Sequence, residues 1–350
     1  MEHSQPAVAL PRRPRLLPGL EVLERKPDEV QVGLDPRHAV VADELPSTVI
    51  DMLRTMDGTR TVDALLEQVN GDDSERLRGV LTGLARFGLL EDASNRRGRR
   101  TVVEPELWPL RAGMRRHDVV ARRERCALAV YGGGRLAVAV SVLLATAGVG
   151  QIDVRAPGLV TASDLGSGLL DGDVGRERGE AIAAAIHRAN SRTRTTRIGG
   201  GRRPDLALLT DAVVPAPEVV HELVADGVPH LPVRIRDGIG IIGPLVFPGR
   251  STCLRCADLT RADLDECWPR VASQLAGRMQ HAELSAVQAA AALATTQVLR
   301  VLSHTPEPPP VWNATLEIDT YDGKVWHRPW DPHPDCRCGA FPPGGLRPEA

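Results

Sequence analysis

The stretch CALAVYGGGRLAVAVSVLLATAGVG, residues 126–150, places an apolar run, a glycine turn and a second apolar run in immediate succession. The first run, Cys126 to Tyr131, is apolar and β-prone, which predicts a buried strand. Gly132, Gly134 and Ala137 satisfy the pattern G-x-G-x-x-[GA], and a helix is expected over 136–147. Strand, glycine turn and helix in this order suit a phosphate at the helix N-terminus. The stretch therefore predicts a doubly wound, Rossmann-like α/β domain.

The residues that follow the turn argue against a bound nucleotide. The next strand of a dinucleotide-binding domain usually supplies an acidic residue for a ribose hydroxyl. Here the strand QIDVRAPG, 151–158, carries Asp153 within it and reaches Ala156 at its end. A later buried strand, DLALLTD, ends in Asp211 and precedes a predicted helix over 217–225. We interpret the turn as a degenerate nucleotide site, at which ATP and Mg²⁺ are not favoured ligands, and its candidate residues are Gly132, Gly134 and Asp211.

Four of the six cysteines fall in two closely spaced pairs. Cys253 and Cys256 follow a hairpin predicted from an Asp-Gly turn, and Cys336 and Cys338 lie near the C-terminus. Four thiolates suit a closed, tetrahedral structural zinc site, which leaves no position for a catalytic water. His333 is an alternative ligand, and unlinked reduced thiols are the alternative interpretation. We predict a Zn²⁺ ion that clamps the C-terminal segment to the end of the hairpin.

The N-terminal part reads as three short strands followed by three helices. The strands are expected over 20–25, 29–34 and 38–43, and the helices over 47–56, 61–69 and 74–87. Thr61 and Ser74 are the predicted N-caps of the second and third helices. This order indicates a small winged-helix-like module. The expected organisation is a module over 15–92, a connecting segment over 93–124, the Rossmann-like domain over 125–342 and a tail over 343–350.

A winged helix can bind duplex DNA or a peptide. DNA binding requires a surplus of basic residues on the reading helix, but the arginines of the third helix are balanced by nearby acidic residues, so nucleic acid is not the favoured partner. An extended peptide could instead pair with the edge of the strand over 38–43 and lie against the third helix. The candidate peptide-binding residues are Val40, Val41, Ala42, Arg78, Leu81 and Ala85. For the apolar residues of that helix, plain core packing is the alternative.

Composition fits a globular cytoplasmic protein. The chain has 350 residues and a formal net charge of −2, so neither a membrane surface nor a polyanion is indicated as its partner. Its N-terminus has no apolar segment typical of a signal peptide. The longest apolar run, over 136–149, is shorter than the roughly 20 residues that a membrane helix needs.

The motifs together resemble a known family. The glycine stretch, DLALLTD, the hairpin, CLRC, an apolar helix over 284–302 and the terminal cysteine pair are similar to the ThiF/MoeB adenylyltransferases, relatives of ubiquitin-activating enzymes, from Arg125 to Gly339. The N-terminal module resembles the PqqD-like element that binds leader peptides of ribosomally made, modified peptides. The combination resembles the leader-peptide-binding ThiF-like protein of azoline-forming (TOMM cyclodehydratase) systems. The resemblance implies a precursor leader peptide and a YcaO-type cyclodehydratase as partners. Because the helix over 284–302 is rich in alanine, we expect it to pack on the sheet or at a homodimer interface.

Several positions depart from the pattern of an active adenylyltransferase. Ala156 and Gly158 stand where an active member has two aspartates after the second strand. Ser167 replaces an arginine of the next loop, and Ala212 replaces the asparagine that usually follows Asp211. Without those carboxylates and that arginine, the protein lacks its main means of neutralising the charge that develops during adenylyl transfer. We therefore predict a peptide-binding scaffold without adenylation activity. The alternatives are an active ATP-dependent adenylyltransferase, with Asp211 as its catalytic carboxylate, and a winged-helix transcription regulator.

Overall fold

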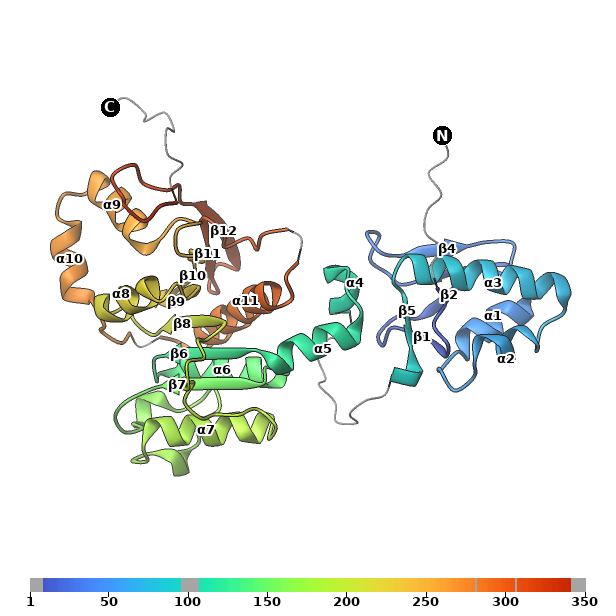
Figure 1. The fold of residues 1–350 in the computed structure, drawn as a ribbon, viewed down its shortest axis with the longest axis horizontal. Helices are drawn as coiled ribbons and strands as arrows, with labels where there is room; N and C mark the ends of the chain where they lie inside the picture. Colours follow the sequence, from blue (N-terminus) through green and yellow to red (C-terminus); the bar gives the residue numbers. More distant parts are fainter. Residues whose placement is uncertain (1–8, 96–106, 281, 306, 341–350) are drawn as a thin grey trace. The chain divides into compact units, whose positions relative to one another are not determined.

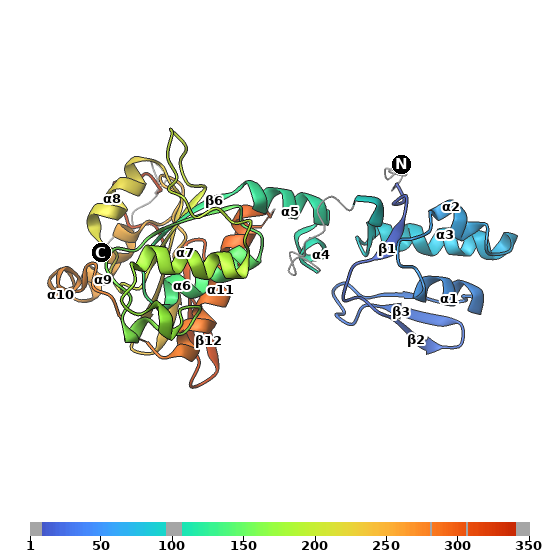
Figure 2. The same ribbon diagram turned by 90° about the horizontal axis from the view of Figure 1, so that it is seen from below.

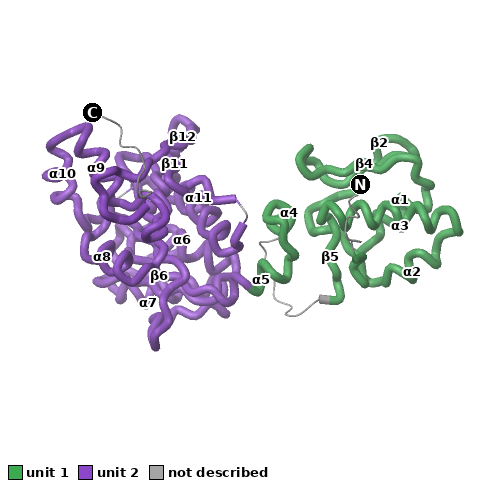
Figure 3. The backbone as a smooth tube through the Cα atoms, turned by 45° about the horizontal axis from the view of Figure 1, so that its top comes forward, with its two compact units in different colours: residues 1–121 green, residues 122–350 purple. Residues whose placement is uncertain are grey.

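The computed structural model describes residues 9–95, 107–280, 282–305 and 307–340, and the chain divides into two compact units, Met1–Ala121 and Arg122–Ala350 (Figure 3). The predicted tail over 343–350 and residues 96–106 of the predicted connecting segment lie outside the described residues. The described part of that segment contains helices α4 (Trp108–Ala112) and α5 (Arg116–Arg125), and the division between the units falls within α5.

The first unit contains the three strands and three helices expected from the sequence. β2 (Val22–Lys26), β3 (Glu29–Val32) and β4 (Val40–Ala42) form an antiparallel sheet in the order β2-β3-β4. Helices α1 (Ser47–Arg54), α2 (Val62–Leu66) and α3 (Gly71–Arg86) follow. A second, two-stranded sheet pairs β1 (Pro14–Leu16) with β5 (Leu90–Asp92), which was not predicted. A 3-10 turn, η1 (Ala93–Asn95), ends this part.

The helix starts of this unit were predicted with mixed success. The Thr61 side chain accepts a hydrogen bond from the Ala64 amide, which confirms it as the N-cap of α2. The prediction of Ser74 as the cap of α3 is wrong, because α3 begins at Gly71 and its N-cap is Asn70. The Ser74 amide already donates to the Asn70 carbonyl at 2.8 Å, so Ser74 lies inside the helix. The acidic residues of the first turn favour this earlier start, since they interact well with the helix dipole.

The second unit is built on a seven-stranded mixed sheet in the order β12-β11-β10-β9-β8-β6-β7 (Figure 1). Its parallel part contains β7 (Gln151–Arg155), β6 (Ala127–Tyr131), β8 (Leu206–Thr210) and β9 (His230–Arg236). Its antiparallel part continues through β10 (Ile239–Ile242), β11 (Ala314–Asp319) and β12 (Lys324–Pro329). The predicted α/β fold is therefore present as a mixed sheet.

Helices cover both faces of this sheet. α6 (Arg135–Thr146), α7 (Arg178–Ala189) and α11 (Leu284–Leu302) lie side by side on one face (Figure 2). α8 (Pro217–Ala225) packs on the other face, where its Leu223 contacts Ala129 and Leu209. α9 (Leu254–Leu264), α10 (Trp268–Leu275) and the 3-10 turns η2 (Ala162–Asp164) and η3 (Asp171–Asp173) complete the unit. Among the described residues, no helix is long and apolar enough to cross a membrane.

Candidate functional site

The glycine turn joins β6 to α6 and is packed against the protein's own side chains. Gly132 has a φ of 136°, a conformation that favours glycine. A Cβ atom on Gly133 would meet the Arg178 side chain and would lie 2.8 Å from the Cβ of Ala156. A Cβ atom on Gly134 would lie 2.9 Å from Oδ1 of Asp211. The turn therefore needs glycine because other parts of the chain approach it closely, whether or not a nucleotide binds.

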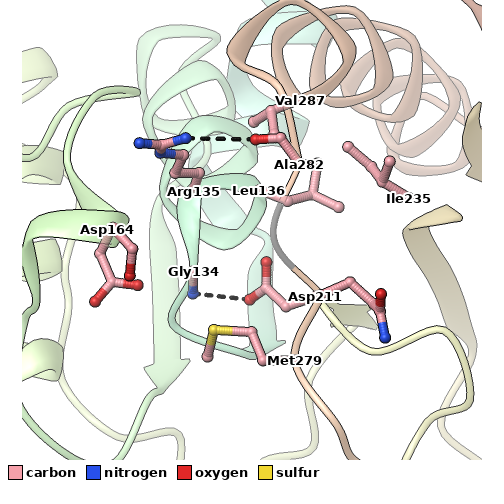
Figure 4. Close-up of a pocket in the computed structure, with 11 residues that line it drawn as sticks. Gly134, Arg135, Leu136, Asp164, Asp211, Ile235, Met279, Ala282 and Val287 are labelled. Atoms are coloured by element: carbon pink, nitrogen blue, oxygen red, sulfur yellow. Dashed lines mark hydrogen bonds between the residues drawn. The ribbon is translucent and has the colours of Figure 1, made fainter. Parts of the chain in front are cut away.

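Asp211 occupies the N-terminus of α6. Its carboxylate Oδ2 accepts a hydrogen bond from the Gly134 amide at 2.9 Å, as the lower dashed line of Figure 4 shows. Thr210 donates to the same oxygen at 3.2 Å from its hydroxyl. Asp211 also has a positive φ of 69°, which is uncommon for a residue other than glycine. This carboxylate takes the place at a helix N-terminus that an anionic ligand commonly takes.

Burial changes the acidity of this group. The Asp211 carboxyl is almost completely buried, and this desolvation raises its pKa above the ordinary value, although amide hydrogen bonds from the Gly134 region oppose the rise. A carboxyl group whose pKa is higher in the folded state binds more protons when folded than when unfolded. Its contribution to stability is therefore lost as the pH rises from the unfolded pKa, about 4, through the folded pKa.

We expect Asp211→Asn to remove this pH dependence. The amide oxygen can still accept from Gly134, but the variant has no charge to bury. The difference between its thermal midpoint and that of the wild type should therefore increase in favour of the variant from pH 4 to pH 8. A gain of about 1 kcal/mol corresponds to roughly 2–4 °C for a unit of this size. Thermal unfolding at several pH values measures it, with the exposed Asp226→Asn as the control. A variant that loses stability relative to the wild type as the pH rises would show that the carboxylate form stabilises the fold.

A small pocket lies beside the glycine turn (Figure 4). Arg135 on its rim donates to the Leu165 carbonyl at 2.7 Å and to the Ala282 carbonyl at 3.4 Å. The lining residues are Gly134, Arg135, Leu136, Ser163, Asp164, Asp211, Ile235, Met279, Gln280, Ala282 and Val287. The acidic residues of this wall are Asp164 and Asp211, and both already have hydrogen-bond partners in the chain.

The positions that depart from the active pattern do not line this pocket, but Ala156 lies against the glycine turn beside it. Ala156, 8% exposed, follows β7 and faces Gly133 with a methyl group where a ribose-binding carboxylate is expected. Asp153 of the same strand does not replace it, because its carboxylate accepts from the Ile198 amide at 3.2 Å and pairs with Arg155 at 3.4 Å. The Ser167 hydroxyl accepts from the Gln288 side-chain amide at 2.9 Å. Asp153 therefore does not take the place of the missing aspartates.

Sequence reasoning missed the ion pair of Arg178 and Asp164. Arg178 Nη2 lies 2.8 Å from Asp164 Oδ2, and the Thr161 amide donates to the same oxygen at 2.8 Å. The Arg178 side chain contacts the glycine turn at Gly133. The two residues are fourteen positions apart, and their meeting depends on the path of the loop between β7 and α7. A motif search centred on the glycine turn contains no signal for it.

The four predicted zinc ligands lie together. Cys253 Sγ is 3.7 Å from Cys256 Sγ and 3.6 Å from Cys336 Sγ, and Cys256 Sγ is 3.6 Å from Cys338 Sγ. All four sulfur atoms lie within 4.8 Å of one another. A tetrahedron with Zn–S bonds of about 2.3 Å has edges of about 3.8 Å, whereas a disulfide requires about 2.05 Å. The cluster therefore fits a tetrahedral metal ion such as zinc.

The other histidine and cysteine side chains considered as ligands or nucleophiles have other partners or lie outside the cluster. His333 Nε2 lies 2.8 Å from an Asp263 carboxylate oxygen, and its Nδ1 accepts from the Asp335 amide at 3.2 Å, so both ring nitrogens have other partners. Burial raises the pKa of the Cys126 thiol to about 11, which suits a packing residue better than a nucleophile. Cys267 is exposed at the start of α10.

The candidate peptide-binding residues are divided between surface and core. Among the described residues β4 pairs only with β3, which leaves its other side as a sheet edge, and Val41 is 46% exposed. Arg78 is exposed on α3, and Ala85 is half-buried. Leu81 is 0% exposed because it packs in the core of the unit, so the expectation that it contacts a peptide at the surface is wrong. Its helical spacing is explained by core packing.

With this geometry in place, known proteins can be compared with the chain. No family model matches it, and no curated protein does. Its fold matches that of E. coli MccB. The structure of MccB with MccA-N7isoASN has a TM-score of 0.68 and 18% identity over 94% of this chain and 99% of that one. The structure of MccB with ATP has a TM-score of 0.68 and 18% identity, over 93% of this chain and 99% of that one. The structure of PaaA has a TM-score of 0.63 and 17% identity, over 89% of this chain and 98% of that one. At these identities the matches support a ThiF-like fold.

Proposed function

We propose that the chain binds a precursor leader peptide at the free edge of β4 and presents it to a YcaO-type cyclodehydratase in azoline biosynthesis, without adenylating it. The observation that carries the proposal is the edge itself. Within the part of the chain that the structure describes, one side of β4 has no strand partner and Val41 is exposed, and an extended peptide can pair with such an edge through main-chain hydrogen bonds. Residues 15–92 are the proposed recognition element, and Arg78 and Ala85 of α3 are its proposed helix contacts.

The comparisons support a peptide partner. MccB, whose fold is similar, has been crystallised with MccA and with its N-formylated form. The second unit is then proposed as a scaffold, held together by a structural zinc at the four cysteines. Retrieval of the full-length protein from its native host, followed by mass spectrometry, tests both proposed partners. The expected result is that a precursor peptide and a YcaO-type protein co-purify with the chain. If neither of them is recovered, the proposal is contradicted.

A second candidate function is an active adenylyltransferase. The observation in its favour is that MccB has also been crystallised with ATP and that this chain keeps the glycine turn beside Asp211. Against it stand the methyl group of Ala156 and the hydrogen bonds that already engage Asp211. An enzyme would need other groups to neutralise the charge that develops on the phosphates.

We expect no ATP–pyrophosphate exchange above background with the purified chain and its peptide. The reason is the missing carboxylate at Ala156, since the aspartates of an active member hold the ribose and Mg²⁺. Radiolabelled pyrophosphate exchange measures this, with an adenylyltransferase of known exchange activity as the positive control. Robust exchange that disappears in Asp211→Ala would establish the adenylyltransferase in place of the scaffold.

A further inference from the structure

A buried arginine on β9, Arg234, has no hydrogen-bond or ion-pair partner among the described residues. Arg234 is 5% exposed, so its side chain lies largely inside the second unit, while its guanidinium nitrogens keep a small solvent-accessible surface. Across the described residues, no group accepts a hydrogen bond from it and no carboxylate lies within ion-pair distance. Guanidinium carries five donors and stays protonated in proteins, so a buried one without partners is costly. The arrangement indicates that an anion from outside the chain completes the site.

The register of the sheet defines which residues surround this arginine. Arg234 and Arg236 are two residues apart on β9, so both point to one face of the sheet. Arg234 is opposite Ile241 of β10, which is in turn opposite Glu317 of β11. Pro232 belongs to the same face and is opposite Leu209, which packs against α8. The two arginines therefore lie on the α8 face of the sheet, away from α11 and the glycine turn.

The carboxylates nearest to Arg234 are used by other groups. Glu317 accepts from Arg328 Nε at 2.7 Å and from the Thr315 hydroxyl at 3.4 Å. Since Arg328 neutralises Glu317, this pair adds no net charge. Arg236 is exposed, and within the described ranges it too has neither a hydrogen bond nor an ion pair through its side chain.

A second neutral pair closes the other side. Asp258 of α9 accepts from Arg261 Nη1 at 3.0 Å and from Trp268 Nε1 at 3.2 Å. The Arg261 guanidinium lies 4.6 Å from the ring centre of Trp330 and 5.2 Å from that of Trp268. Both pairs are internally satisfied, so Arg234 and Arg236 are two positive charges on this face without an ion-pair partner among the described residues.

The electrostatics of Arg234 agree with this geometry. Burial lowers its pKa to about 10, and the like charges of Arg261 and Arg236 contribute to the decrease. The group is still charged at neutral pH, so the chain holds a positive charge in a place where it is poorly solvated. An anion that enters this site would meet a guanidinium with little competing water, which strengthens their interaction.

We propose that Arg234 and Arg236 bind carboxylates of an acidic segment of the peptide that this chain carries, an inference that rests on the proposed peptide-binding function. Alternate residues of a strand are about 7 Å apart. Acidic side chains at alternate positions of an extended peptide have the same spacing, so each could meet one guanidinium. The planar fork of arginine suits a carboxylate through two parallel hydrogen bonds. The tryptophans that flank Arg261 provide apolar walls for the remainder of the peptide.

The test uses the full-length protein and two capped pentapeptides, Glu-Val-Glu-Val-Glu and its glutamine counterpart, in calorimetric titrations. We expect the glutamate peptide to bind and the glutamine peptide not to bind. Arg234→Gln should weaken it by about 30-fold or more, because a buried charge pair loses one partner. The exposed Arg236→Gln should weaken it by about threefold. Arg203→Gln, which removes an exposed arginine elsewhere in the unit, is the matched control and should bind as the wild type does.

Stability separates a binding role from a structural one. Without peptide, Arg234→Gln should melt at or above the wild-type temperature, because an unpaired buried charge has been removed. If that variant fails to fold, Arg234→Lys keeps the charge without the fork and should bind with intermediate affinity. The proposal is overturned if the acidic peptide does not bind, if Arg234→Gln binds it normally, or if inorganic phosphate binds the site more tightly. None of these results alters leader binding at β4, which is measured with separate variants.

Discussion

We expect the purified chain to contain about one zinc ion and to lose it in Cys253→Ser and in Cys336→Ser. The sulfur atoms of these cysteines are 3.6 Å apart and come from segments 83 residues apart, so removal of either ligand opens the connection between them. Apparent binding free energies of structural zinc are about 10–16 kcal/mol in small zinc modules. A loss of only about 4 kcal/mol would lower the midpoint of the second unit by roughly 8–16 °C. Elemental analysis and thermal unfolding measure the two effects.

The chain provides matched controls for this prediction. Cys267→Ser removes an exposed thiol outside the cluster and should change neither the zinc content nor the midpoint. His333→Ala should keep the zinc, because its ring nitrogens interact with Asp263 and Asp335 and not with the cluster. A chelator should lower the midpoint of the wild type and leave that of Cys253→Ser unchanged. Metal-free wild-type protein with an unchanged midpoint would refute the four-thiolate site.

The parts of the fold that follow local patterns could be predicted from the sequence. The strand, glycine turn and helix over 126–147 correspond to β6 and α6 within one or two residues. The bounds of α8 and α11 were predicted without error, the first marked by a proline at its start and the second by a long apolar repeat. The hairpin of β9 and β10 followed from its Asp-Gly turn. These signals act over a few residues, which is why a single sequence contains them.

Other features depend on contacts between distant residues, which local patterns do not encode. The pairing of β1 with β5 joins Pro14 to Asp92, and each strand is only three residues long, too short to show an alternation. The burial of Leu81 has the same origin, since a helical apolar position is identical in sequence whether it packs in the core or faces a peptide. The cysteine pairs are the exception, because the chemistry of the ligands itself identifies distant partners.

Unlike the cysteines, Arg234 could not be identified as a candidate functional residue from the sequence. Its sequence context, an arginine within an apolar strand, gives no sign that Glu317 and Asp258 already have other partners. Only the register of four strands and the position of α9 reveal that the charge is unpaired. A functional group of this kind is therefore found by accounting for hydrogen bonds in the structure and not by a motif.

We expect that proline at the β4 position whose N–H group faces the free edge strongly weakens leader binding while the fold is retained. Successive backbone N–H groups of a strand point to opposite sides, so of Val41 and Ala42 one faces β3 and the other faces the free edge. Proline removes the N–H group at either position. The variant that loses the edge donor should keep the wild-type midpoint and bind the co-purified leader about 100-fold less tightly, equivalent to about 2.7 kcal/mol. The other variant should lose stability, because it breaks the β3–β4 pairing.

The comparison of Val41→Pro with Ala42→Pro therefore reports on strand addition whatever the sequence of the bound peptide. Val41→Thr, which keeps the N–H group and a β-branched side chain, is the control and should bind within about threefold of the wild type. Because pairing is through the main chain, affinity should change little between 50 and 500 mM salt, whereas duplex DNA binding would weaken steeply. If both proline variants fold and still bind the leader normally, then β4 is not the peptide edge, and the free edge of β2 on the far side of the same sheet becomes the position to test.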